Sequence, residues 1–279
     1  MAPKIPTVAL RQALLQQVLT AVNVVNVINQ QYAVANLFPP SSNPQPILYF
    51  ADPLTAEFAT FGVNPAAAEL TWDRWPNRTM TVQQLDTRCV DYFKTPTVPP
   101  NDWFDDYEEP SNSLGPAKAL NLLGHSYRTD TVHLDFSPRA TMPRTTAAKT
   151  MTTANYKIFV QRFRQMVAAD LPWFILALAL CRNVKAAIMA GSVTNYDSDY
   201  LDIFLDRFLK NHLPSHSLTL RQPLGLKGDP GQPTALYDLA GPGFSIPVLF
   251  VSRGPSRDHG AKLAREVQRN LCVLKKARF

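Results

Sequence analysis

Four short apolar runs, separated by segments with helical periodicity, place the strongest constraint on how this chain folds. The runs lie at 57–63, 131–136, 185–190 and 246–251, and helices are expected at 7–32, 80–93, 155–181, 196–209 and 257–276. Strands that alternate with helices are typical of a parallel sheet covered on both faces. We therefore predict an α/β fold, a three-layer α/β/α arrangement with a short, mainly parallel four-stranded central sheet. Pro172 should end or kink its helix, because proline lacks the N–H that a helix interior needs.

Two further segments bear on the domain organisation. A Pro/Ser/Asn-rich break follows Pro39, so we predict an N-terminal helix and linker, 1–46, packed on a main domain, 47–279. Residues 211–243 are expected to hold short strands and Gly/Pro-rich turns.

Polar residues close each of the four apolar runs. They are Asn64-Pro65, Asp135 to Ser137, Gly191-Ser192 and Ser252 to Ser256. In an open α/β sheet the ligand binds outside the carboxyl ends of the strands. The sequence therefore predicts a site built from these four loops.

Composition limits the class of protein. Apolar residues make up 46% and charged residues 18%, a globular balance. The net charge of +6 is compatible with an anionic partner but does not require one. The three cysteines have no zinc-type spacing, which favours reduced thiols in a cytoplasmic protein. The most apolar stretch, 171–181, is about half of a membrane span, so no membrane partner is expected.

Two residues of the second apolar run are of metal-ligating type. His133 and Asp135 face the same side of a predicted strand, but no third ligand lies nearby in the sequence, so no metal is expected.

The first strand end carries a recognisable motif. Gly62-Val63-Asn64-Pro65 resembles the water-activating motif of the uracil-DNA glycosylase superfamily, in the Gly-x-Asn-Pro form of its mismatch-specific branch. Segments 132–138, 187–192 and 248–256 resemble, in the same order, the base-reading strand, the third strand with its Gly-Ser end, and the final strand with its x-Pro-Ser loop. The resemblance covers 47–276.

The resemblance implies a role for each matched position. Asn64 would hold the attacking water, Arg253 or His259 would replace a histidine that this chain lacks at Gly254, and Trp72 or Trp75 would stack on a flipped base. Ala66 and Asp135 would accept a C5-substituted, amine-bearing base, because a carboxylate accepts a hydrogen bond from the N4 amino group of cytosine. Further substrate contacts would come from Gly62, Pro65 and Ser137, and DNA contacts from Ser192, Ser252, Ser256 and Arg257.

Simpler interpretations stay open for several of these residues. Asn64 is equally suited to cap a turn, Trp75 to anchor the core, and Asp135 to pair with Arg139 or Arg144. The basic residues of the last helix are expected to form a solvated face; they are Lys262, Arg265, Arg269, Lys275 and Lys276.

The resemblance implies a monofunctional DNA glycosylase. It would act on a DNA duplex as a monomer, flip out a modified cytosine or another enlarged pyrimidine, and hydrolyse the N-glycosidic bond without metal or organic cofactor. Three alternatives remain: a uracil or mismatch DNA glycosylase, a catalytically weak or inactive DNA- or protein-binding module on the same fold, and a hydrolase of free nucleosides.

Overall fold

The computed structural model divides into two compact units. It describes residues 7–31, 46–63, 80–94, 119–139, 149–192, 215–224, 234–253 and 259–276. One unit, here called the helical unit, comprises Met1–Leu54, Val63–Val98 and Leu134–Arg182. The other, the sheet unit, comprises Thr55–Gly62, Pro99–His133 and Asn183–Phe279. Each is described by itself.

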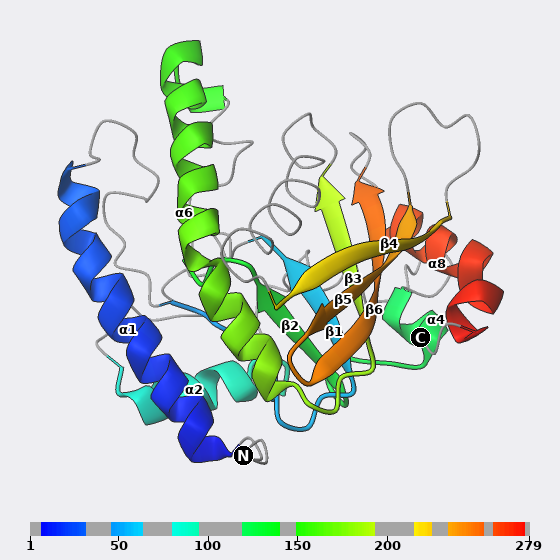
Figure 1. Ribbon diagram of the computed structural model, residues 1–279. Coiled ribbons are helices and arrows are strands. Elements are labelled where there is room, and N and C mark those ends of the chain that lie inside the picture. The colour runs from blue at the N-terminus through cyan, green and yellow to red at the C-terminus, as the bar shows by residue number, and fades with distance from the viewer. Residues whose placement is uncertain are drawn as a thin grey trace. The chain divides into compact units, whose positions relative to one another are not determined.

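Within the described residues, the helical unit contains α1 (Val8–Gln31), α2 (Val82–Val90) and α6 (Thr153–Leu180) (Figure 1). Helix α1 packs against both α2 and α6. The contact face of α1 is an apolar stripe at helical spacing, formed by the buried residues Leu14, Leu15, Val18 and Leu19. The helices predicted at 7–32 and 80–93 are confirmed.

Helix α2 begins where its sequence provides a capping box. The Thr81 side chain accepts a hydrogen bond from the Gln84 N–H, and the Gln84 side chain accepts one from the Thr81 N–H. Two backbone donors of the first turn are thereby satisfied, which fixes the start of the helix.

Helix α6 continues through Pro172, so of the two outcomes expected there, an end or a kink, the structure excludes an end. Its neighbours Leu171 and Phe174 are completely buried, with 0% exposure. Their burial contributes about 1.5–3 kcal/mol each, enough to offset the roughly 3 kcal/mol that an interior proline costs.

By length and composition α6 is able to cross a membrane, with a mean hydropathy of 1.4 over an 18-residue window. The apolar stretch predicted at 171–181 is only the last part of this helix, which begins at Thr153. Half of the window is buried inside the structure, and core helices of soluble proteins pass the same test.

The described strands form one six-stranded sheet (Figure 1). They are β1 (Phe58–Gly62), β2 (Thr131–Asp135), β3 (Ala186–Ser192), β4 (Ser217–Pro223), β5 (Ala235–Gly241) and β6 (Phe244–Arg253), in the order β2-β1-β3-β6-β5-β4. Strands β1, β3 and β6 are parallel neighbours, whereas β6, β5 and β4 pair antiparallel. The α/β class is confirmed. The sheet is mixed and has six strands, because 211–243 adds β4 and β5 to the four that were predicted.

Two described helices accompany the sheet in its unit. Helix α4 (Ala119–Leu123) packs against α8 (His259–Lys276), and α8 also packs against β6. All five residues of β1 are buried, as expected for a parallel strand covered on both faces. The helix predicted at 196–209 lies outside the described residues.

The hairpin between β5 and β6 explains why the antiparallel extension forms. Gly241 pairs with Phe244, which leaves the two-residue connection Pro242-Gly243. Proline suits the first of these positions, and Gly243 has φ +84°, a value that an L side chain rarely adopts. Gly241 is required for another reason: a Cβ there would lie 2.4 Å from Cδ2 of His216.

Candidate functional site

Four predicted site residues share one edge of the sheet unit. In the parallel pairing of β3 with β6, Gly191 is level with Ser252 and Ser192 with Arg253. In the pairing of β1 with β3, Phe61 is level with Met189, and Gly62 is the next and last residue of β1. Parallel strands end on the same side, so Gly62, Ser192, Ser252 and Arg253 gather at their carboxyl ends.

The strand order reverses at this edge. From β1 the sheet continues to β2 on one side and to β3 on the other. Such a topological switch point is where open α/β sheets bind their ligands, outside the carboxyl strand ends. His259, also predicted to act here, is the first residue of α8, the helix that follows β6. The switch point lies between the ends of β1 and β3, where the sequence motifs predict a site.

In the helical unit, the segments that follow β1 and β2 are joined by a hydrogen bond. The Ser137 N–H donates to the Val63 carbonyl over 3.0 Å, and the Ile47 N–H donates to the Pro138 carbonyl over 2.8 Å. Val63 immediately precedes Asn64 in the chain. Val63, in the motif predicted to bind water, and Ser137, in the motif predicted to read the base, are therefore adjacent.

A buried ion pair fixes the segment around Ser137. Arg139 donates from Nε and Nη2 to the two carboxylate oxygens of Asp170, at 2.7 and 2.9 Å. The Ser137 hydroxyl donates to the same carboxylate over 2.7 Å and accepts from the Arg139 N–H over 3.2 Å. The hydroxyl proton of Ser137 is thus already used within the protein, so a substrate contact by this side chain would be as an acceptor.

Asp135, the last residue of β2, is 4% exposed. Arg139, one of its suggested partners, forms the bidentate pair with Asp170. The other suggested partner, Arg144, lies outside the described residues. So do seven predicted site residues: Asn64, Pro65, Ala66, Trp72, Trp75, Ser256 and Arg257. Their roles stay predictions.

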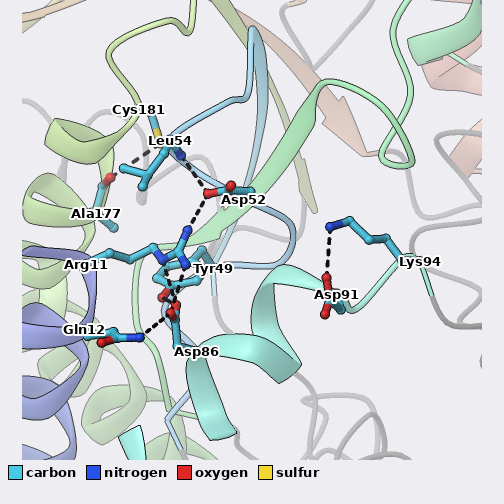
Figure 2. Close-up of polar contacts among 10 residues, drawn as sticks. All are labelled: Arg11, Gln12, Tyr49, Asp52, Leu54, Asp86, Asp91, Lys94, Ala177 and Cys181. Atoms are coloured by element: carbon cyan, nitrogen blue, oxygen red, sulfur yellow. Dashed lines mark hydrogen bonds and ion pairs between the residues drawn. The ribbon is translucent and has the colours of Figure 1, made fainter. Parts of the chain in front are cut away.

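A second buried network holds α1 in the helical unit (Figure 2). Asp86 accepts hydrogen bonds from Arg11 Nη2 at 2.9 Å and from the Tyr49 hydroxyl at 2.6 Å. Arg11 Nη1 also donates to Asp52 over 2.6 Å. Burial alone lowers the pKa of Arg11, but the bond to Asp86 and the nearby negative charges outweigh burial and raise it. Burial raises the pKa of the Tyr49 phenol, so this hydroxyl stays protonated. Apart from Arg11 Nε, which contacts Asp86 as an ion pair without a hydrogen bond, these groups satisfy one another, and the network is structural.

His133 is held by a third buried network, in the sheet unit. The Thr60 hydroxyl lies 2.8 Å from His133 Nδ1 and 2.6 Å from the Tyr127 hydroxyl, and His133 is 2% exposed. Within the described ranges, no three His, Cys, Asp or Glu side chains form a group able to hold a metal ion.

Sequence reasoning missed Asp170 and Asp86, the acceptors of the two ion networks. Both lie on helix faces that are otherwise apolar: Asp170 between Val167 and Leu171, and Asp86 beside Leu85. A carboxylate at a buried helix position needs a cationic partner. An aspartate on an otherwise apolar helix face is therefore the sequence signal that identifies Asp170 and Asp86.

Comparisons of the chain with protein-family models, with curated proteins and with solved structures found no match.

Proposed function

We propose that this chain is a monofunctional DNA glycosylase acting on a flipped pyrimidine with an enlarged C5 substituent, a modified cytosine in particular. The observation that carries the proposal is the switch point between β1 and β3, flanked by Gly62 and Ser192 and extended by Ser252 and Arg253 on β6. These residues come from motifs that resemble one enzyme superfamily, and they share one sheet edge.

The chemistry assigns a part to each element. Water adds to the anomeric carbon of the sugar while the base departs with the bonding electrons, through a sugar of oxocarbenium character, and the proton that the water loses ends on the departed base anion. Asn64 would orient that water through its amide, which cannot take the proton as a carboxylate would, so slow turnover is expected. Arg253 or His259 would stabilise the negative charge on the departing base.

Substrate choice depends on two positions in this proposal. Asp135 would accept a hydrogen bond from an exocyclic amine, and the small Ala66 would leave room for a C5 substituent. The fixed backbone around Ser137 supports such a role, because a reader of base edges must itself be held in place.

A non-catalytic DNA-binding module is the second candidate. The observation that favours it is the Ser137–Arg139–Asp170 network, which shows that part of the base-reading segment serves the protein interior. The absence of a histidine before Pro255 points the same way.

The test is a panel of duplexes, each with one modified pyrimidine, scored for alkali-labile abasic sites under single-turnover conditions. Asn64→Ala should abolish base release, while Gln83→Ala, at an exposed position on α2, should match the parent. Asp135→Asn should shift preference toward uracil-like bases by about tenfold or more, since one good hydrogen-bond pair discriminates by ~1–3 kcal/mol. Duplex binding without release from any substrate would favour the binding module. Efficient hydrolysis of free nucleosides would favour the small-molecule hydrolase.

A further inference from the structure

The outer face of α8 carries charge of a single sign. Among the side chains described on this helix, the exposed ones are Arg265, Gln268, Arg269, Cys272, Lys275 and Lys276. Four of them are cationic and none is anionic. The acidic residue of the helix, Glu266, is 7% exposed and forms an ion pair with Arg269. We call the four cations, Arg265, Arg269, Lys275 and Lys276, the α8 basic face.

This face differs from the other described helices. The exposed positions of α1 and α2 carry no charge, and α6 exposes a single lysine, Lys157. A solvated helix face usually mixes the two signs, because opposite charges three or four residues apart stabilise each other. The unmixed face of α8 therefore is not the arrangement that helix stability alone would favour.

Three of the exposed cations elsewhere in the described chain have carboxylate partners. Lys94 pairs with Asp91, Lys185 with Glu57, and Arg221 with Asp238. In contrast, Arg265, Lys275 and Lys276 have no carboxylate partner within the residues that the structure describes. Their charge is available to an external anion.

The geometry of the face fits a row of phosphates. Arg265 and Lys276 are eleven residues apart and, at 100° per residue, nearly in line along the helix. A rise of 1.5 Å per residue gives a row about 16 Å long. Phosphates follow one another every ~3.4 Å along the axis of one DNA strand, so the row spans about five of them.

A membrane surface fits the observations less well. Membrane-surface helices bury an apolar face in lipid. The apolar face of α8 (Leu263, Val267 and Leu274) is buried inside the protein, and the helix packs on β6 and α4.

From these observations we propose that the α8 basic face binds the phosphate backbone of duplex DNA beside the flipped nucleotide. That the partner is DNA rests on the proposed function. That the cations of the α8 basic face are available to an anion does not depend on it. Helix α8 follows β6, whose carboxyl end carries Ser252 and Arg253. The face would thus extend the contact from the strand ends to flanking phosphates and act without regard to sequence.

The experiment titrates a labelled, undamaged 20-base-pair duplex at several salt concentrations. The test variant is Arg265→Gln/Lys275→Gln/Lys276→Gln. Its matched control, Lys94→Gln/Lys185→Gln/Arg221→Gln, removes the same net charge from sites that pair with carboxylates. A third variant, Arg265→Lys/Lys275→Arg/Lys276→Arg, keeps the charge and should bind as the parent does.

Each lost phosphate contact removes about 0.9 from the slope of log affinity against log salt. The test variant should therefore lose about 2 to 3 from the slope and bind at least tenfold more weakly near 0.1 M salt, while the control stays near the parent. Equal slopes for test variant and control would overturn the proposal. The proposal would also be overturned if the test variant bound duplex as the parent does but no longer bound phosphatidylserine-containing vesicles.

Base release at saturating enzyme separates this inference from the proposed function. The test variant should keep the parent's single-turnover rate, because α8 contributes binding and not chemistry. If no duplex yields an abasic site but the slope still falls, the glycosylase proposal fails and the α8 proposal stands.

Discussion

Replacing Asp170 with leucine should destabilise the protein strongly, since it leaves a buried cation without its partner. Arg139 is 9% exposed and donates two hydrogen bonds to Asp170, and the Ser137 hydroxyl loses its acceptor as well. Removing one member of a buried ion pair costs about 3–5 kcal/mol. At roughly 2–4 °C per kcal/mol for a chain of this size class, the melting temperature should fall by about 6–20 °C.

Urea unfolding followed by tryptophan fluorescence measures the effect, and Trp173 on α6 provides a local probe. The double variant Arg139→Met/Asp170→Leu should recover most of the lost stability, because no charge is then left stranded. An exposed pair supplies the comparison: Lys94→Gln, which breaks the contact with Asp91, should change stability by less than about 1 kcal/mol. A double variant as unstable as Asp170→Leu alone would refute the reasoning.

Three other outcomes are expected. Partial burial tends to raise the pKa of Asp130, but hydrogen bonds from the Ser126 N–H and from His125 outweigh burial and lower the pKa below 3.8. The stability that ionised Asp130 provides is therefore full above about pH 4 and is lost as the pH falls. In urea unfolding, the difference in stability between the parent and Asp130→Asn should accordingly narrow below about pH 4. Burial raises the pKa of the thiols of Cys89 and Cys181, whereas Cys272 is exposed. At pH 8 a thiol reagent should therefore modify Cys272 quickly in the native protein and all three cysteines only after unfolding. Gly243→Ala should lower the free energy of unfolding by about 1–2 kcal/mol, as measured with urea, because φ is +84° at this position. A glycine-to-alanine change at a loop position with negative φ should not carry this cost.

Much of the fold follows from the sequence because its elements are locally specified. Strands β1 and β2 end within one residue of their predicted limits, since each is a buried run closed by turn residues. Strands β3 and β6 extend further than predicted, to Ser192 and Arg253, because they pair with each other through those residues. That pairing joins segments about 60 residues apart, and nothing local signals it.

The candidate site was less accessible to sequence reasoning. The motifs indicated which strand ends to examine, and the topology brought the ends of β1, β3 and β6 together. The partner of Arg139 was not visible, because Asp170 lies 31 residues away on another element. Local patterns identify which residues are polar and buried, but only the packed structure shows which of them meet.

The contacts of Arg11 also bear on how the chain is made. Arg11 is synthesised before both of its partners, Asp52 and Asp86, which are 41 and 75 residues further along the chain. At about 5–20 residues per second, the ribosome takes roughly 4–15 s to add the second of them. Until then Arg11 lacks Asp86, and the stripe of Leu14, Leu15, Val18 and Leu19 lacks helix α2 to pack against. An apolar stripe left uncovered in this way is the kind of surface that makes nascent chains depend on chaperones.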